Sequence, residues 1–156
     1  MLNKAQTFSA DFLIASCVFL MITSLVYAYW TYIFTGMEER RFVEDMSEKI
    51  HLASQIWFKE GYPIYWSADN VRELGLQNDN KLNYTKILSL EDIGYQKVKT
   101  LIGCENYDLF YRLYDQTNYT IFQFGTPPTN AEYVMREKRI GILNESIVLI
   151  DVVLWK

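Results

Sequence analysis

The residue types that most often carry catalysis are sparse in this sequence. His51 is the only histidine, and the residues three and four positions from it, which would share its face of a helix, are serine, glutamate and glutamine. We expect a solvated side chain there, not a catalytic base. The sequence contains no H-E-x-x-H pair, no phosphate-binding glycine loop and no G-x-S-x-G turn. We therefore expect no enzymatic activity and no bound cofactor.

The acidic residues do not converge either. Three acidic pairs are adjacent in sequence, so their side chains diverge around a helix and are interpreted as solvated: Glu38-Glu39, Glu44-Asp45 and Glu91-Asp92. The run from Asn78 to Asn80 offers oxygen ligands, but it lacks the alternating spacing, central glycine and closing glutamate of a calcium loop. We interpret that run as a turn and expect no metal site.

Three N-x-S/T sequences are possible N-glycosylation sites, with Asn83, Asn118 and Asn144 as the residues that would carry the sugar. Two of them fall in predicted turns and the third lies beside one. These positions suggest exposure outside the cell.

Length and charge exclude some classes of protein. The chain has 156 residues and a formal net charge of -4, so no basic stripe suggests nucleic acid as a partner. Cys17 lies in an apolar run and Cys104 well beyond it, so we expect no disulfide between them.

The apolar run from Phe12 to Phe34 is the feature around which the other segments are arranged. It contains no charged residue, and as a helix with a rise of ~1.5 Å per residue it spans about 34 Å, close to the ~30 Å hydrocarbon core of a bilayer. Its far end carries aromatic residues of the kind found at membrane interfaces: Tyr27, Tyr29, Trp30 and Tyr32. The sequence therefore predicts a membrane helix.

Asp11 stands at the near end of this run. A carboxylate beside hydrocarbon is costly and usually has a partner or a function. Two interpretations stay open: a carboxylate that lies among the lipid headgroups, or one that takes part in assembly.

The apolar run does not resemble a removable secretory signal, because it is too long and aromatic residues follow it. The residues before it, Lys4-Ala5-Gln6-Thr7-Phe8-Ser9-Ala10-Asp11, resemble the archaeal class III signal of type IV pilin-like proteins. In that family a prepilin peptidase cuts before the apolar helix, which is retained. The resemblance implies cleavage between Ala5 and Gln6, with Asp11 as an assembly residue.

The resemblance includes one departure and one competing motif. The family usually has its acidic residue at the fifth mature position, whereas Asp11 would be the sixth, so that Thr7 counts as an inserted residue. Ile14-Ala15-Ser16-Cys17 has the form of a lipoprotein box, but the apolar core before it is too short. The simpler interpretation of Cys17 is a small apolar residue in a membrane helix.

Beyond Gly36, which we expect to loosen the helix, the pattern turns amphipathic. Apolar residues recur at steps of three and four as far as Phe58, with charged pairs such as Asp45/Lys49 on the other side. Gly61 and Pro63 then end the helix. The next segment, GYPIYWSADNVRELGL, carries Trp66, Val71, Leu74 and Leu76 as its apolar anchors.

Two short helices are predicted between Leu82 and Gly103, which would cap the second. Four strands follow at 108–114, 119–124, 133–143 and 147–155. The last strand, nearly all apolar, suits a central or terminal position covered on both faces. We predict an α+β fold in which a long N-terminal helix packs on a small antiparallel β-sheet, arranged as a meander, as in pilins. The predicted divisions are a leader at 1–5, a hydrophobic transmembrane or assembly helix at 6–36 and an extracytoplasmic globular domain at 37–156.

The positive-inside rule and prepilin processing predict opposite orientations in the membrane. Lys4 precedes the apolar run, whereas Arg40, Arg41 and Lys49 follow it, and the positive-inside rule would place the C-terminal domain in the cytoplasm. Prepilin processing requires the opposite orientation, with a cytoplasmic N-terminus and an extracellular domain, and we prefer it because a domain of this size can be translocated despite its charge.

The leading hypothesis is a structural subunit, minor rather than major, of an archaeal type IV filament that serves in surface attachment or filament assembly. Its expected partners are a prepilin peptidase, other pilin subunits that contact the N-terminal helix, and the membrane. The alternative is a single-span sensor with an extracytoplasmic ligand-binding domain. In that case the aromatic GYPIYW segment would line a ligand groove instead of packing in the core.

Overall fold

The structure is a computed structural model that describes the backbone of residues 3–156 and the side chains of residues 10–156. Helix α1 runs over Asn3–Gln55 and is followed by a short 3-10 helix, Ile56–Phe58, where the sequence predicts the end of the long helix. Gly36 does not interrupt α1, because one glycine costs only about 1 kcal/mol relative to alanine in a helix interior.

Contacts within the chain define two compact units, Met1–Val43 and Glu44–Lys156. We call the second one the head unit. It contains the final turns of α1 and everything that follows. The fold is α+β, with a long N-terminal apolar helix and a small antiparallel sheet packed on that helix's final turns.

The sheet of the head unit has four antiparallel strands: β3 (Asp108–Tyr114), β4 (Thr120–Gly125), β5 (Val134–Leu143) and β6 (Ser146–Trp155). Their order is β4-β3-β6-β5, so the predicted meander is wrong: the last strand lies between β3 and β5. The burial of β6 agrees with this position: Val152, Val153 and Leu154 are completely buried, and pairing with β3 and β5 leaves β6 without an open edge.

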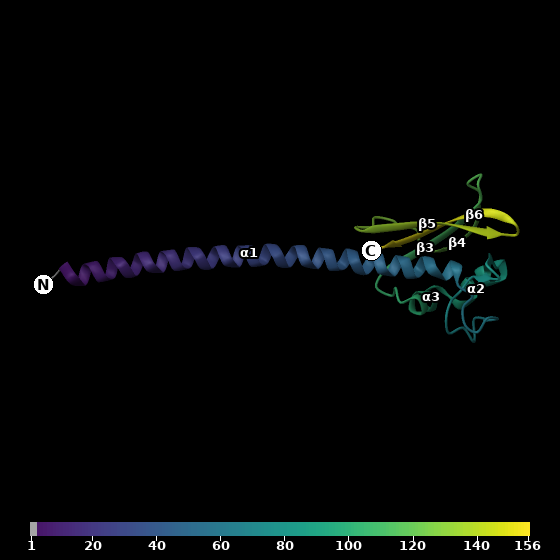
Figure 1. Ribbon diagram of the computed structural model, residues 1–156, viewed down its shortest axis with the longest axis horizontal. Helices are drawn as coiled ribbons and strands as arrows, with labels where there is room; N and C mark the ends of the chain where they lie inside the picture. Colours follow the sequence, from purple (N-terminus) through teal and green to yellow (C-terminus); the bar gives the residue numbers. More distant parts are fainter. Residues whose placement is uncertain (1–2) are drawn as a thin grey trace. The chain divides into compact units, whose positions relative to one another are not determined.

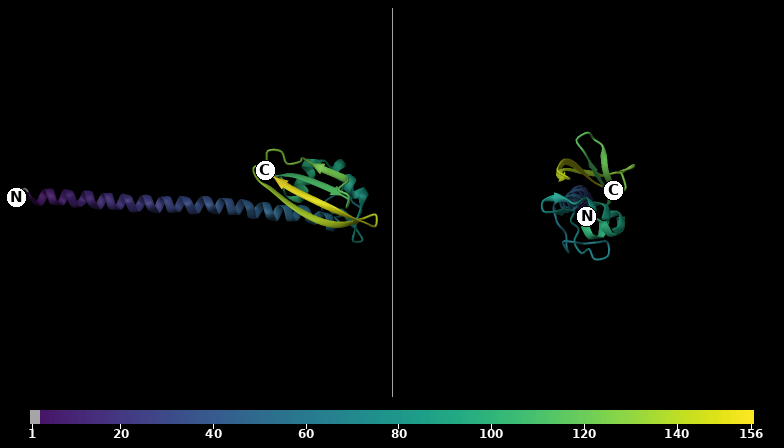
Figure 2. Two further views of the ribbon diagram at one scale, coloured as in Figure 1. Left: turned by 90° about the horizontal axis from the view of Figure 1, so that it is seen from above. Right: turned by 90° about the vertical axis from the view of Figure 1, so that its right-hand side faces the viewer.

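The head unit has three layers (Figures 1 and 2). The end of α1 lies between the sheet on one side and helices α2 and α3 on the other. The Tyr111 hydroxyl of β3 donates a hydrogen bond to the Ala53 carbonyl oxygen over 2.8 Å, and its ring meets Trp57 edge to face at 5.4 Å between centroids. Met46, Ala53 and Trp57 are almost fully buried in this core.

Two short helices form the layer opposite the sheet, and a small hairpin beside them contacts strand β5. Helices α2 (Tyr84–Ile93) and α3 (Tyr95–Ile102) confirm the predicted pair, and Gly103 ends α3 in the left-handed conformation with φ of 79°. The predicted turn at 78–80 joins the two-residue strands β1 (Gln77–Asn78) and β2 (Lys81–Leu82), which the sequence analysis did not identify.

The loop between α1 and this hairpin is held at its base by glycine. A Cβ atom on Gly75 would lie 2.1 Å from the backbone nitrogen of Gly61, so only glycine permits this close approach of the two backbone segments. The Trp66 indole donates to the Gly75 carbonyl oxygen over 2.9 Å. The predicted anchors of the loop are buried: Trp66, Val71, Leu74 and Leu76.

Candidate functional site

The segment from Phe12 to Phe34 exposes apolar side chains on every side of α1. Its large residues are 39–78% exposed, and none of its most apolar window is buried within the chain. By length and composition this is one helix that could cross a membrane. The surface therefore needs a cover from outside the chain, either lipid or another protein.

The hydroxyl groups of Thr23, Ser24 and Thr31 in this segment donate to carbonyl oxygens of the helix itself. Thr31 donates to the Tyr27 carbonyl oxygen over 2.9 Å, and Ser24 donates to that of Met21 over 2.8 Å. Such internal bonds leave these side chains compatible with an apolar surrounding.

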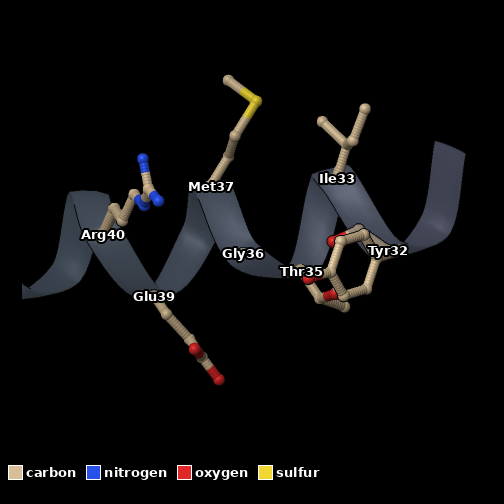
Figure 3. A pocket seen from close by; sticks show the side chains of 7 residues that line it. All are labelled: Tyr32, Ile33, Thr35, Gly36, Met37, Glu39 and Arg40. Atoms are coloured by element: carbon tan, nitrogen blue, oxygen red, sulfur yellow. The ribbon is translucent and has the colours of Figure 1, made fainter. Parts of the chain in front are cut away.

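The aromatic end of the segment includes a stacked pair, Trp30 and Phe34, with ring centroids 5.1 Å apart. Just beyond it, Gly36 leaves an open notch on the helix surface (Figure 3). The side chains around the notch, among them Tyr32, Met37 and Arg40, point in different directions. Because they do not converge, the notch offers no set of groups that could hold a ligand.

The residues predicted for processing and assembly lie in α1. Asp11 is exposed. The side chains of Ala5 and Gln6 lie outside the residues whose side chains the structure describes.

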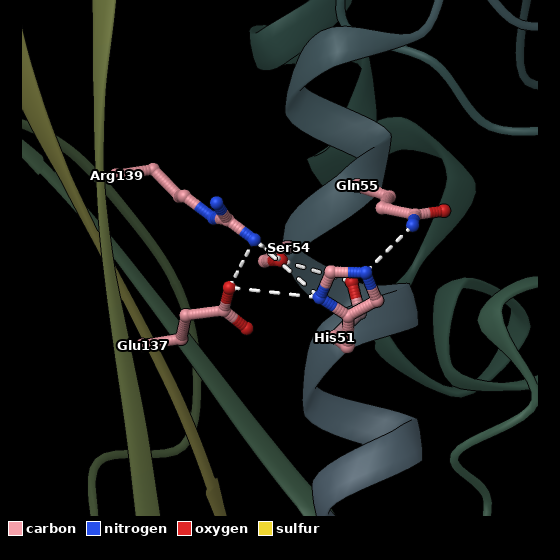
Figure 4. A network of polar contacts seen from close by, with 5 residues as sticks. All are labelled: His51, Ser54, Gln55, Glu137 and Arg139. Atoms are coloured by element: carbon pink, nitrogen blue, oxygen red, sulfur yellow. Dashed lines mark hydrogen bonds and ion pairs between the residues drawn. The ribbon is translucent and has the colours of Figure 1, made fainter.

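In the head unit, a polar network joins α1 to the edge strand β5 (Figure 4). Arg139 approaches Glu137 on its own strand and, through Nη2, lies 3.4 Å from both Ser54 Oγ and His51 Nδ1. Gln55 contacts the other ring nitrogen over 2.9 Å. Because a guanidinium can only donate, Nδ1 of His51 is the acceptor in the arginine contact. His51 is half exposed as expected, but its ring connects helix and sheet.

The sequence analysis placed Asp45 on a solvated face, paired with Lys49. Asp45 is exposed as predicted, but the pairing is wrong, because no Asp45–Lys49 ion pair forms among the described side chains. Its carboxylate instead accepts a hydrogen bond of 2.6 Å from the Tyr107 hydroxyl. Burial, with Asp45 beside the hydroxyl, raises the pKa of Tyr107 to about 12.

Two buried lysines hold the layer below the sheet together, and sequence reasoning identified neither. Lys86 Nζ donates to the Glu60 and Gln77 carbonyl oxygens over 2.6 and 3.1 Å and to Asn78 Oδ1; we call this set the Lys86 cradle. Burial lowers the pKa of Lys86, although the nearby Glu60 carboxylate opposes that effect. The only sequence signal was a lysine on the apolar face of α2.

The second lysine belongs to a cluster around Asp108. Lys99 Nζ lies 3.4 Å from Asp108 Oδ1 and 5.2 Å from the centre of the Tyr95 ring. The Tyr95 hydroxyl donates to the same carboxylate over 2.9 Å and accepts from the Leu109 amide over 2.8 Å. The polar contacts of the cluster join α3 to β3 within the head unit, so we interpret it as structural.

The three possible glycosylation residues are at turns or helix ends. Asn83 caps α2, with its side-chain oxygen accepting from the Lys86 amide over 3.2 Å. Asn118 and Asn144 are exposed in the β3–β4 and β5–β6 turns, with φ of 67° and 47°. Arg112 donates to both Asn118 Oδ1 and Thr120 Oγ1, which fixes that site in its turn.

The aromatic GYPIYW segment is divided between core and surface. Trp66 packs in the core, whereas Tyr62, Ile64 and Tyr65 are exposed, Tyr65 by 85%. Among the described residues, no group of histidine, cysteine, aspartate and glutamate side chains could hold a metal ion. Cys17 and Cys104 are both free thiols.

Comparisons of this chain with protein-family models, curated proteins and solved structures find no match.

Proposed function

We propose that this chain is a structural, pilin-like subunit, minor rather than major, of an archaeal type IV filament that acts in surface attachment or filament assembly, and that it is not an enzyme. One observation carries the proposal: the segment from Phe12 to Phe34 is apolar and exposed all round, while the end of the same helix is built into a folded α+β unit. A filament subunit needs both parts, because the apolar segment must pass from lipid to neighbouring subunits.

Processing and orientation follow from the resemblance of residues 4–11 to a class III signal. A prepilin peptidase on the cytoplasmic side cuts between Ala5 and Gln6, and the head unit lies outside the cell. Asp11 keeps the residues before it out of the hydrocarbon, since burying a carboxylate there is costly.

Asp11 has a second role after cleavage. The new amine of Gln6 on one subunit pairs with the Asp11 carboxylate of a neighbour inside an apolar core. An unpaired carboxylate in that environment is expensive, so the pair selects one register of stacking. Helix contacts that repeat without closing a ring produce a fibre.

The N-terminus of the mature protein tests the proposal. Co-expression with an archaeal prepilin peptidase should yield a chain that begins at Gln6, and Ala5→Trp should block the cut without affecting membrane insertion. Recovery of an intact Met1 with active peptidase present would remove the pilin assignment. Cleavage after Ser16 with a lipid on Cys17 would overturn it as well.

A variant at Asp11 separates processing from assembly. Asp11→Ala should leave the cut largely intact and reduce incorporation into filaments, measured as the fraction of processed subunit in sheared surface material. Asp11→Glu, which keeps the charge, is the matched control. Normal incorporation of Asp11→Ala would refute the assembly role.

A second function keeps support from the exposed aromatic loop. Tyr62, Ile64 and Tyr65 stand on a loop whose base is fixed by Gly61 and Gly75, as in a binding loop on a rigid scaffold. A single-span sensor would use them to bind a small ligand and would keep its first five residues. Absence of processing together with weaker ligand binding by Tyr65→Ala would favour the sensor.

A further inference from the structure

Strand β5 presents a basic and apolar row on the outer face of the sheet. Its outward residues Arg136, Lys138, Ile140 and Ile142 are all exposed, because α1, α2 and α3 cover only the opposite face. The Asp151 carboxylate of β6 is buried on this face and lies 3.4 Å from Arg136 Nε. Lys138 is the register partner of Asp151 but forms no ion pair among the described side chains, so the row carries excess positive charge.

Helix α2 presents the opposite pattern on its solvent side. Tyr84 and Leu88 are 40% and 42% exposed, and Glu91 and Asp92 follow them in the last turn. The last turn contains no basic residue, and neither acid forms an ion pair among the described side chains. Acids at a helix C-terminus face the negative end of the helix dipole, so a cation supplied from outside the helix would stabilise them.

We propose that the outer row of β5 binds the solvent side of α2 of a second copy of this chain. This inference rests on the proposed function and specifies how neighbouring head units meet in the filament. Charge complementarity selects this partner, because the basic residues of one surface match the uncompensated acids of the other.

The part of the β5 row from Lys138 to Ile142 also matches the α2 surface in length. Lys138 to Ile142 extends over about 13 Å of strand, and Asp92 to Tyr84 over about 12 Å of helix. With Lys138 opposite Asp92, the isoleucines lie opposite Leu88 and Tyr84, so an apolar contact continues the charged one.

The β5 row and the α2 surface lie on opposite sides of the head unit, so the same contact can form again between each copy and the next. The β5 row lies on the outer face of the sheet, whereas α2 lies in the layer on the other side of the sheet (Figure 1). A copy that uses its β5 row therefore leaves its α2 surface open to the next copy. Heterologous contacts of this kind extend into a fibre instead of closing into a dimer.

Two charge reversals and their mixture test the proposal. The first variant is Arg136→Glu with Lys138→Glu, and the second is Glu91→Lys with Asp92→Lys. In each variant both surfaces carry charge of the same sign. Each variant should therefore self-associate at least about tenfold more weakly than the unmodified chain. In an equimolar mixture, each surface of one variant meets an opposite surface of the other, so association should return.

The measurement is sedimentation velocity of the intact, uncleaved chain in uncharged detergent micelles at low ionic strength. Detergent covers the apolar helix, so the result reports contacts between head units and does not depend on processing at Ala5. Arg72→Glu with Lys97→Glu changes the net charge by the same amount at other exposed positions and should associate like the unmodified chain. Unchanged thermal unfolding checks that each variant is folded, and Arg136→Gln with Lys138→Gln replaces the first variant if it is not.

Several results would overturn the inference. The unmodified chain could stay monomeric at low salt, or the charge-reversed variants could associate like it. The equimolar mixture could associate as weakly as either variant alone, or the control variant could weaken association equally. A chain that still begins at Met1 after exposure to the peptidase would refute the filament proposal. It would not affect the test of the contact between head units.

Discussion

Replacing Lys86 by methionine removes the ammonium group at the centre of the Lys86 cradle while keeping most of the side-chain volume. The lost contacts are those to the Glu60 and Gln77 carbonyl oxygens, at 2.6 and 3.1 Å, and to the Asn78 side chain. These contacts tie α2 to the start of the loop after α1 and to β1. Because Lys86 is only 6% exposed, water cannot easily replace the lost donors.

The expected cost follows from those contacts. Hydrogen bonds from a charged group contribute about 1.5–3 kcal/mol each, and a buried acceptor left without a donor costs about 1–3 kcal/mol. The cost of burying the ammonium, which is the main cause of the lowered pKa of Lys86, offsets part of this sum. We expect Lys86→Met to lower the free energy of unfolding of the head unit by about 2–4 kcal/mol, or roughly 4 °C in Tm per kcal/mol for a unit of this size.

The assay is thermal unfolding of the full chain in detergent micelles, followed by near-ultraviolet circular dichroism, to which the buried Trp57 and Trp66 contribute. Lys97→Met is the matched control, because Lys97 is exposed and, within the described part of the chain, its Nζ donates only to the Ala68 carbonyl oxygen. It should cost less than about 1 kcal/mol. A Lys86→Met variant that unfolds at the same temperature as this control would refute the reasoning.

Three further predictions concern the head unit. Gly75→Ala places a Cβ atom 2.1 Å from a backbone nitrogen and should destabilise the head unit by at least about 2 kcal/mol in denaturant unfolding, whereas Gly94→Ala, although strained by its positive φ, meets no atom within 4 Å and should cost less. Because the pKa of Tyr107 is raised to about 12, the folded chain keeps a proton that the unfolded chain loses above pH 10. The free energy of unfolding should therefore fall between about pH 10 and 12. Tyr107→Phe should reduce that fall, measured as the melting temperature at a series of pH values. Cys104, buried and with a pKa raised to about 11, should react with iodoacetamide only after unfolding, and rapid labelling of the folded chain would contradict its burial.

The elements that depend on local pattern were predictable from the sequence. Strand β3 occupies the predicted residues, β5 and β6 differ from their predicted limits by one residue at the start, and β4 is displaced by one residue at both ends. Gly103 as a cap and the turn at 78–80 were also predictable, because each depends on the backbone preferences of one to three adjacent residues. The exposed apolar surface between Phe12 and Phe34 was predictable for the same reason, because the run contains no charged residue and is therefore apolar on every side of a helix.

The order of the strands needed the tertiary structure. A meander and the observed order use the same strands and turns, and they differ only in which strand lies beside β3. The apolar composition of β6 indicated a covered strand, but it did not distinguish a neighbour on one edge from neighbours on both. That choice is made by the pairing of β6 with β3 on one edge and with β5 on the other, and β3 is distant from β6 in sequence.

The polar contacts of the head unit show the same limit. His51 meets Arg139, Asp45 meets Tyr107, and Lys86 meets the backbone of Glu60, each pair widely separated in sequence. From sequence neighbours alone, each of these side chains was interpreted as solvated or passed over. Helical spacing identifies partners only within about one turn, so the residues that each charge finally meets are determined by how the sheet, α1 and α2 pack together.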